Sequence, residues 1–396
     1  MKILLLENIH SEAVRVLNNR GYEIETASGA LGEDDLIEAL DGVDMLGIRS
    51  RTNVTRRVLE AAPQLSAVGA FCIGTNQIDL EAASDHSVAV FNAPYSNTRS
   101  VVELAIAEII AMARHLTDRN RDMHAGLWDK SATGSHEVRG RTLGIVGYGN
   151  IGSQLSIVAE ALGMRVYFYD LADKLALGNA KRVGSLEELL EVAETISLHV
   201  DGRSSNKGFF GAEQFAQMRP RSLFLNLSRG QIVDLDALHD ALDSGHLAGA
   251  AIDVYPSEPR NKGEEFVSNL RGMPNVILTP HVGGSTLEAQ EDIGRFVAGK
   301  LGDYDALGNT SMSVNFPEVA AAEVTTRRVV HLHQNVPGVM ARLNSALANH
   351  DMNIGSQMLA TRGEIGYAVT DISGDSYDGL LAELSALDET KRVRIL

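Results

Sequence analysis

The sequence is poor in three features, and each shortage excludes a class of protein. It contains one cysteine, Cys72, so no disulfide can form within the chain. It has 35 Lys and Arg against 52 Asp and Glu, which gives a formal net charge of −17. Because the phosphate backbones of nucleic acids attract basic surfaces, we do not expect this protein to bind nucleic acid. Its most apolar stretch, 101–116, is interrupted by Glu103 and Glu108, which is typical of a packed helix rather than a membrane span.

The remaining composition is that of a globular protein. At 396 residues the chain is long enough for two or three domains, and 44% hydrophobic residues supply a sizeable core. The first residues, MKILLLENIH, contain too few apolar side chains before Glu7 for a signal peptide. We therefore expect a soluble protein of the cytoplasm.

Strands alternating with helices predict parallel sheets over most of the chain. Short apolar runs alternate with helical patterns over 1–96, and the same rhythm returns over 97–285. The segment 306–324 is small and polar without a clear period, and we interpret it as a linker. After it, a strand-helix-strand-strand-helix-strand order predicts a ferredoxin-like unit of about 70 residues.

A glycine fingerprint marks the second of these segments. Gly147, Gly149 and Gly152 form a G-x-G-x-x-G that follows a predicted strand and opens a predicted helix. The first glycine permits a tight turn, the second lets a pyrophosphate approach the backbone, and the third lets the helix pack closely. Asp170 ends the next predicted strand, where its carboxylate would bind the adenosine ribose and repel a 2′-phosphate. We therefore expect NAD rather than NADP.

Three ionisable side chains stand at the carboxyl ends of predicted strands, where open parallel sheets bind ligands. Arg229 follows SLFLNLS, Glu258 follows AAIDVY, and His281 ends NVILTPH. A histidine base suits removal of an alcohol proton, and a carboxylate beside it would stabilise the imidazolium. An arginine can hold a carboxylate in bidentate fashion. Each residue alone is most simply a surface loop residue, but together they predict a dehydrogenase.

Longer stretches carry a family resemblance. GIVGYGNIG, NLSRGQIVD, AAIDVYPSEP and LTPHVGGST resemble motifs of the D-isomer-specific 2-hydroxyacid dehydrogenases. SRT, FCIGTNQIDL, FNAPYSNTRSV and NFPEV are similar, more specifically, to its bacterial branch that oxidises 3-phospho-D-glycerate and carries a C-terminal ACT domain. The resemblance covers nearly the whole chain. It implies NAD-dependent oxidation of 3-phospho-D-glycerate to 3-phosphooxypyruvate, the first step of L-serine biosynthesis, in an oligomer that is often a tetramer.

The resemblance also implies an α/β architecture of two doubly wound parallel-sheet domains and a ferredoxin-like ACT domain. The implied boundaries are a discontinuous flavodoxin-like substrate domain of 1–96 and 286–310, an inserted Rossmann NAD domain of 97–285, and an ACT regulatory domain of 325–396. The implied catalytic residues are Arg229, Glu258 and His281. The implied coenzyme positions are Gly147, Gly149, Asn150, Ile151, Gly152, Asp170, Leu227, Ser228, Arg229, Asp253, His281, Val282, Gly283 and Gly284. No metal is expected.

Substrate and effector positions follow from the same resemblance. The implied substrate ligands are Arg49, Ser50, Arg51, Asn97 and Lys130. The implied serine ligands are His333, Asn335 and Asn353, and amides and an imidazole can bond a hydroxyl, an ammonium and a carboxylate. A solvated loop remains the alternative for the two arginines, and a purely dimerising module remains the alternative for the last domain.

One loop departs from the family pattern, and two other functions remain open. The family commonly has a proline and a threonine-rich turn after SLHV, where this chain has DGRSSNKGFFG at 201–211. That loop usually lies near the coenzyme, so its contacts are left unpredicted. The alternatives are a glyoxylate or hydroxypyruvate reductase on the same scaffold and a dehydrogenase-like, NAD-sensing binding protein.

Overall fold

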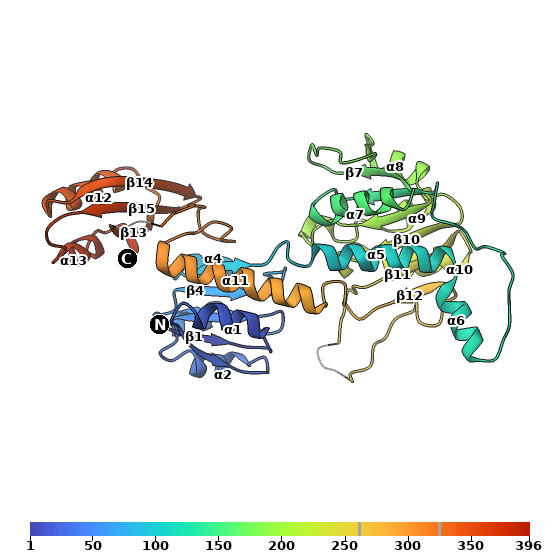
Figure 1. Ribbon diagram of the computed structural model, residues 1–396, viewed down its shortest axis with the longest axis horizontal. Coiled ribbons are helices and arrows are strands. Elements are labelled where there is room, and N and C mark those ends of the chain that lie inside the picture. The colour runs from blue at the N-terminus through green and yellow to red at the C-terminus, as the bar shows by residue number, and fades with distance from the viewer. Residues whose placement is uncertain (260–262, 324–325) are drawn as a thin grey trace. The chain divides into compact units, whose positions relative to one another are not determined.

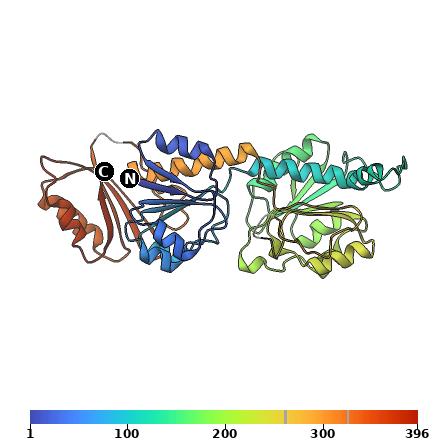
Figure 2. The same ribbon diagram turned by 90° about the horizontal axis from the view of Figure 1, so that it is seen from below.

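The structure, a computed structural model, describes residues 1–259, 263–323 and 326–396. Its contacts divide into unit 1, Met1–Ser96 with Gln290–Leu396, and unit 2, Asn97–Ala289 (Figures 1 and 2). Thr325, the first residue of the predicted regulatory domain, lies outside the described residues. Within the described ranges, every helix is too short or too polar to cross a membrane.

The first sheet of unit 1 is parallel, with the order β2-β1-β3-β4-β5 of flavodoxin-like folds. Its strands are β1 (Lys2–Leu5), β2 (Glu23–Thr26), β3 (Met45–Ile48), β4 (Ala67–Ala70) and β5 (Ala89–Asn92). Because side chains alternate along a strand, Ile3 and Leu5 pack on one face and Leu4 on the other. Helices α1 (Ser11–Asn18) and α11 (Leu287–Leu307) cover the first face, and α2 (Glu33–Ala39), α3 (Arg56–Ala61) and α4 (Leu80–Asp85) cover the second.

The C-terminal part of unit 1 has the predicted ferredoxin-like order, which confirms an ACT-like fold. Its elements are β13 (Arg327–Gln334), α12 (Val339–Asn349), β14 (Asn353–Arg362), β15 (Ile365–Ser373), α13 (Leu380–Ser385) and β16 (Thr390–Ile395). The antiparallel sheet has the order β14-β15-β13-β16. Both helices pack on one face of it, through Leu343 and Leu384 among others. The opposite face joins the core of the first sheet, where Leu332 and Tyr367 pack in the same cluster as Tyr304.

The last strand, β16, fastens this sheet to the rest of unit 1. The guanidinium of Arg392 donates to the carbonyls of Leu65 and Pro63, both at 2.9 Å. The guanidinium of Arg394 lies 4.5 Å from the centroid of the Tyr304 ring and donates to the Tyr304 carbonyl at 2.8 Å. Two cationic side chains thus satisfy main-chain acceptors of the neighbouring domain.

The segment predicted to be a linker has little regular structure but is packed. Asn315 is only 8% exposed. Its side-chain amide donates to the Val88 carbonyl and its side-chain oxygen accepts from the Val90 N–H, both at 2.9 Å. The segment therefore continues the hydrogen bonding of β5, which its polar composition did not reveal.

Unit 2 contains one parallel sheet of seven strands in the order β12-β11-β10-β9-β6-β7-β8. They are β6 (Thr142–Val146), β7 (Arg165–Tyr169), β8 (Lys181–Arg182), β9 (Thr195–Leu198), β10 (Ser222–Asn226), β11 (Leu247–Ile252) and β12 (Val276–Leu278). Numbered within the unit, the first six follow the Rossmann order 3-2-1-4-5-6. The direction of strand succession reverses between β6 and β9, and dinucleotides bind at such a switch point.

Helices cover both faces of this sheet (Figure 1). On one face lie α5 (Thr98–Ala113) and α7 (Asn150–Ala161), and on the other lie α8 (Leu186–Val192), α9 (Ala212–Gln217) and α10 (Leu235–Asp243). Leu223 and Leu225 of β10 point to the first face and Phe224 to the second. The helix α6 (Leu116–His124) follows α5. The predicted doubly wound α/β fold is confirmed.

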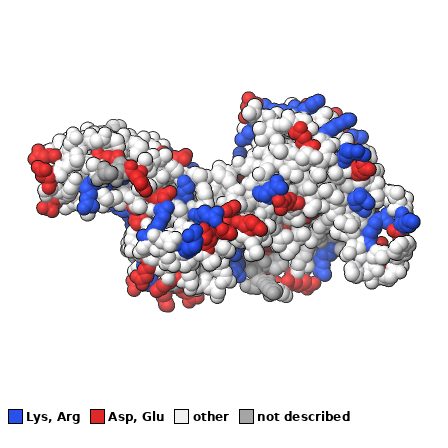
Figure 3. Space-filling model, in the orientation of Figure 1, with Lys and Arg blue, Asp and Glu red and all other residues white. Residues whose placement is uncertain are grey.

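The surface mixes charges of both signs. On the face in Figure 3, Lys and Arg side chains are interspersed with Asp and Glu. In unit 1, for example, Arg295 pairs with Glu12, Glu291 and Asp292. The acidic excess of the sequence is thus partly offset by local ion pairs.

Candidate active site

The glycine fingerprint forms a turn that only glycine can make. Gly147 has φ +92°, and a Cβ placed on it would lie 2.6 Å from the carbonyl oxygen of His199. A Cβ on Gly152 would lie 2.2 Å from the carbonyl oxygen of Gly147. Gly149 differs, because no described atom lies within 4 Å of its Cβ position. It caps α7, whose first N–H groups receive no side-chain cap from the described residues, so the turn offers donors to a pyrophosphate.

The carboxylate of Asp170 is fixed at the end of β7. One oxygen accepts the Tyr148 N–H and the other accepts the Ala172 N–H, both at 2.8 Å. The Tyr148 ring stacks on Phe168 at 3.7 Å between centroids, which holds the turn against the strand. A carboxylate has about four lone-pair sites, so acceptor capacity remains for ribose hydroxyls. The residues present therefore fit a dinucleotide.

The imidazole of His281 is held by Glu258. Its Nδ1 lies 2.9 Å from one carboxylate oxygen and 3.1 Å from the other. Because an ionised carboxylate only accepts, Nδ1 carries the proton and Nε2 is left as the proton acceptor. Glu258 is itself oriented by the N–H of Tyr255 at 3.1 Å. His281, three residues after the end of β12, has φ +55°, a left-handed conformation that turns the chain.

Charges within this group act on one another. The hydrogen bond with Glu258 raises the pKa of His281 above its usual value, although burial opposes the rise and the charge of Arg229 lowers it. Burial raises the pKa of Glu258, but the hydrogen bonds from His281 and Tyr255 and the positive charges of His281 and Arg229 outweigh it, so its pKa lies below the usual range. The structure thus brings together the three residues that the sequence proposed as catalytic.

Arg229 stands on a turn tied to the end of β10. The side-chain oxygen of Asn226 accepts the Ser228 N–H at 3.1 Å and its hydroxyl at 2.7 Å, and the Asn226 amide donates to the Arg229 carbonyl at 3.1 Å. The Arg229 guanidinium donates to the Ser228 carbonyl at 2.7 Å. One bond of the guanidinium is thus used for positioning.

Asp253 holds the loop that follows His281. It is 1% exposed and accepts the Thr279 hydroxyl at 2.6 Å and the N–H groups of Val282 and Gly283 at 2.8 Å each. This supporting role of Asp253 and Thr279 was missed from the sequence, although both residues flank predicted strand ends. A Cβ on Gly284 would lie 2.3 Å from the amide nitrogen of Asn97, so the predicted substrate ligand Asn97 lies against the same loop.

Lys130 is attached to a different part of unit 2. Its segment is tied to the C-terminal end of α5, where the His136 N–H donates to the Ala113 carbonyl at 2.7 Å and the His115 ring contacts the Gly134 carbonyl at 3.1 Å. Asn97 caps the opposite end of this 16-residue helix, which is about 24 Å long. The structure therefore tethers the segments of these two predicted substrate ligands to opposite ends of α5.

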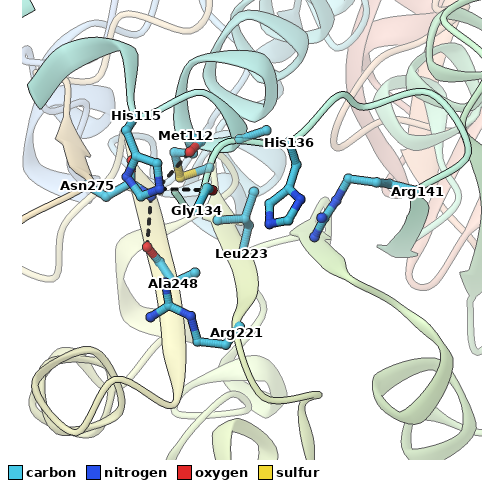
Figure 4. Close-up of a pocket in the computed structure, with 10 residues that line it drawn as sticks. Met112, His115, Gly134, His136, Arg141, Arg221, Leu223, Ala248 and Asn275 are labelled. Carbon is cyan, nitrogen blue, oxygen red and sulfur yellow. Dashed lines mark hydrogen bonds between the residues drawn. The ribbon is translucent and has the colours of Figure 1, made fainter. Parts of the chain in front are cut away.

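A small pocket lies near this tethered segment, but it is not the active site (Figure 4). It includes Leu223 and Ala248 at the amino ends of β10 and β11, the edge opposite to the catalytic residues. Its volume of about 30 Å³ suits one water molecule. The Asn275 side-chain oxygen and the Arg141 Nε, which line it, have no hydrogen-bond partner among the described residues, and a water would satisfy them.

In unit 1, a buried carboxylate organises the loop that carries the predicted substrate ligands Arg49, Ser50 and Arg51. Glu7 is 4% exposed and accepts the N–H groups of Arg49 at 3.2 Å, Arg51 at 3.1 Å and Thr52 at 2.9 Å. The loop follows β3, and Ser50 and Arg51 are exposed on it. The Arg51 guanidinium makes only a loose pair with Glu7, at 3.8 Å. Sequence inspection missed Glu7, whose signal is a carboxylate directly after the apolar run of β1.

The predicted serine ligands lie at two ends of the C-terminal sheet. His333 pairs with Gly366 at one end of β15, and Asn353 pairs with Ser373 at the other, seven residues and roughly 23 Å away. Asn335 lies with His333, because its amide donates to the Gly363 carbonyl at 3.0 Å. His333 is buried and stacks on His331 at 5.0 Å, and burial lowers the pKa of both imidazoles. One chain alone therefore does not bring the three together.

Comparison with known families agrees with this geometry. Residues 106–283 match the NAD binding domain of the D-isomer specific 2-hydroxyacid dehydrogenases, and residues 329–392 match an AHAS small subunit-like ACT domain. Among solved structures, the chain is similar to D-2-hydroxyisocaproate dehydrogenase, with a TM-score of 0.73 and 26% identity over 80% of this chain and 100% of that one. It is also similar to a Staphylococcus aureus NAD-dependent formate dehydrogenase in complex with NAD, with a TM-score of 0.64 and 28% identity over 77% and 96%.

Curated relatives match the full chain. It is 51% identical over 398 residues to D-3-phosphoglycerate dehydrogenase of Haemophilus influenzae, covering 100% of this chain and 97% of the relative. It is 49% identical over 399 residues to D-3-phosphoglycerate dehydrogenase of Escherichia coli K12, with the same coverage. The chain therefore belongs to the D-3-phosphoglycerate dehydrogenases, NAD-dependent oxidoreductases within the D-isomer-specific 2-hydroxyacid dehydrogenases.

Proposed function

We propose that this protein oxidises 3-phospho-D-glycerate to 3-phosphooxypyruvate with NAD, the first step of L-serine biosynthesis, in the cytoplasm. The observation that carries the proposal is the imidazole of His281, hydrogen-bonded through Nδ1 to Glu258 within the field of Arg229. Full-length similarity to enzymes named for this substrate supports it.

We propose a role for each of the three side chains. Nε2 of His281 takes the proton of the C2 hydroxyl, and Glu258 stabilises the imidazolium that results. Arg229 binds the substrate carboxylate, and its charge stabilises the developing carbonyl oxygen. NAD, when bound, supplies the acceptor for the C2 hydride. Asp253 holds the His281 loop in place through three hydrogen bonds.

The phosphate requires cations in a protein of net charge −17. We assign Arg49, Ser50 and Arg51 to it, supported by the Glu7 carboxylate that orders their backbone. Asn97 belongs with the loop after His281. Lys130 is tethered at the far end of α5, so its part in substrate binding requires contact with another copy of the chain.

A substrate comparison tests this function. We expect kcat/KM for reduction of 3-phosphooxypyruvate to exceed that for glyoxylate by roughly 10²-fold or more. Glyoxylate has no phosphate, so the arginines that would bind the phosphate are left without a partner. Following NADH absorbance gives both rates. Arg51→Met should remove most of the preference for 3-phosphooxypyruvate. Arg57 is an exposed arginine paired with Glu33 and Asp34, so the control variant Arg57→Met should retain this preference.

The two alternative functions give different outcomes in the same assay. Equal turnover of glyoxylate and 3-phosphooxypyruvate would identify a glyoxylate or hydroxypyruvate reductase. NAD binding without turnover of any of these acids would identify an NAD-sensing binding protein.

We further propose that the protein is a homotetramer inhibited allosterically by L-serine at the ACT domain. The predicted ligands lie at opposite ends of β15, so a serine site formed by His333 and Asn335 of one chain needs Asn353 of another. The strand β14 supports such an assembly, because it is a ten-residue edge strand with mostly exposed or half-exposed side chains.

Serine inhibition is therefore expected to depend on Asn353. Asn353→Ala should raise the serine concentration for half-inhibition at least about tenfold, since the amide proposed to hydrogen-bond serine is lost. Asn349→Ala, on α12 beside Glu383, is the matched control and should keep normal inhibition. Light scattering should give a mass near four times 42.6 kDa for wild type and both variants. Unchanged inhibition in Asn353→Ala would move the effector site elsewhere.

A further inference from the structure

The loop that departs from the family pattern lies at the switch point of the NAD sheet. It follows β9, the strand next to β6. His199, which leads from β9 into the loop, packs its carbonyl against Gly147 of the fingerprint turn. Further on, the Gln231 amide donates to the Gly202 carbonyl at 2.8 Å, and a Cβ on Gly202 would lie 3.0 Å from Cγ of Arg229. The loop therefore contacts the turn that carries Arg229, and the residue that leads into it contacts the fingerprint turn.

Within this loop, Asp201 clamps the guanidinium of Arg203. Arg203 donates through Nε at 2.7 Å to one carboxylate oxygen and through Nη2 to the other. The Asn206 amide donates to the Asp201 carboxylate at 3.1 Å and to the main-chain carbonyl of Asp201 at 2.9 Å. The arginine is 61% exposed, so this clamp fixes its direction while leaving its remaining donors accessible.

The charges around Arg203 point to the adenosine half of the coenzyme. Asp170, the ribose residue, attracts Arg203 as a second carboxylate after Asp201. The positive charge of Arg229 also acts on Asp201 in this loop. An exposed guanidinium on this loop, attracted by Asp170, stands beside the switch point at which a dinucleotide carries its phosphates.

We propose that Arg203 is a coenzyme-binding residue that pairs with phosphate oxygens of the adenosine half and, together with Asp170, sets the preference between NAD and NADP. Asp170 repels a 2′-phosphate, whereas Arg203 attracts one. The net preference for NAD is therefore the difference between two opposing charges, rather than the effect of one carboxylate alone.

Titration calorimetry of the full chain with NAD, NADP and ADP-ribose tests the proposal. Arg203→Ala should lower the affinity for NAD and ADP-ribose by about 5–10-fold, as expected for the loss of one charge-assisted contact. Its affinity for NADP should fall by more. Asp170→Ser should tighten NADP at least about tenfold, and the Asp170→Ser/Arg203→Ala double variant should lose most of that gain. The affinities of Arg203→Lys should lie between those of wild type and Arg203→Ala, because lysine keeps the positive charge but lacks the paired N–H donors of the guanidinium.

Arg219→Ala is the matched control, since Arg219 is an exposed arginine of the same unit that precedes β10 at the amino edge of the sheet. It should bind all three ligands as wild type does. Arg203→Ala with affinities within twofold of wild type would overturn the proposal, and so would a double variant that keeps the gain in NADP affinity. The titrations contain no substrate, so their outcome is independent of which hydroxy acid the enzyme oxidises.

Discussion

Replacing His281 by Asn is expected to lower kcat by about 10²–10⁴-fold, while the Kd for NAD changes by less than about threefold. The variant loses the group whose Nε2 takes the hydroxyl proton. Asn is the preferred replacement because the position has φ +55°, and Asn adopts this left-handed conformation more readily than Ala. Steady-state oxidation of 3-phospho-D-glycerate and calorimetric titration with NAD measure the two quantities.

The companion variant Glu258→Gln separates the base from the group that tunes it. Oxidation requires a neutral His281, so its rate rises as pH passes upward through the pKa of that imidazole. Because Glu258 raises this pKa, its neutralisation should move the midpoint of the rise to lower pH. A His281→Asn enzyme within tenfold of wild type, or an unmoved midpoint in Glu258→Gln, would contradict these assignments.

Replacing Glu108 by Gln is expected to stabilise the protein at alkaline pH. Glu108 lies on α5, is 3% exposed, and has no hydrogen-bond partner for either carboxylate oxygen among the described residues. Burial, with a smaller contribution from the charge of Asp253, raises its pKa to about 8. Ionising it in the folded state is therefore costly, by roughly 3–5 kcal/mol when fully charged. The isosteric amide cannot ionise and avoids this cost.

The sign of the pH dependence follows from the two pKa values. The folded-state pKa of about 8 exceeds the ordinary 4.5, so the stability that protonated Glu108 contributes is complete below about 4.5 and is lost as pH rises through 8. The difference in thermal midpoint between Glu108→Gln and wild type should thus grow from pH 5 to pH 9, by roughly 10 °C. Glu103→Gln, an exposed carboxylate on the same helix paired with Arg99, should show a constant difference. A constant difference for Glu108→Gln as well would refute the buried charge.

The fold class could be predicted from the sequence, and so could the positions of residues that belong to a local motif or follow a strand end. The fingerprint glycines lie between a strand and a helix, as in dinucleotide-binding turns, and the structure gives Gly147 the expected positive φ. Arg229, Glu258 and His281 each follow an apolar strand, and parallel strands deliver their carboxyl ends to one edge. The order of strands and helices along the C-terminal domain was also predicted, from its apolar runs.

Contacts between distant segments could not be predicted in this way. Glu7 acts on a loop more than 40 residues away, and no local pattern reports that its carboxylate is buried. Asp253 fixes the His281 loop through contacts 26–30 residues distant. The side chain of Asn315 hydrogen-bonds to β5, so a polar segment that resembles a linker is packed. In each case a polar side chain satisfies main-chain groups that the sequence alone does not pair.

The C-terminal sheet and the first sheet share one hydrophobic core, in which Tyr304 and Phe316 meet Leu332 and Tyr367. Removing the regulatory region would consequently strip the cover from these aromatic rings and leave the main-chain acceptors of Pro63 and Leu65 without their arginine. The proposed serine site is thus better tested by substituting Asn353 than by deleting the C-terminal sheet, because the deletion would expose this shared core.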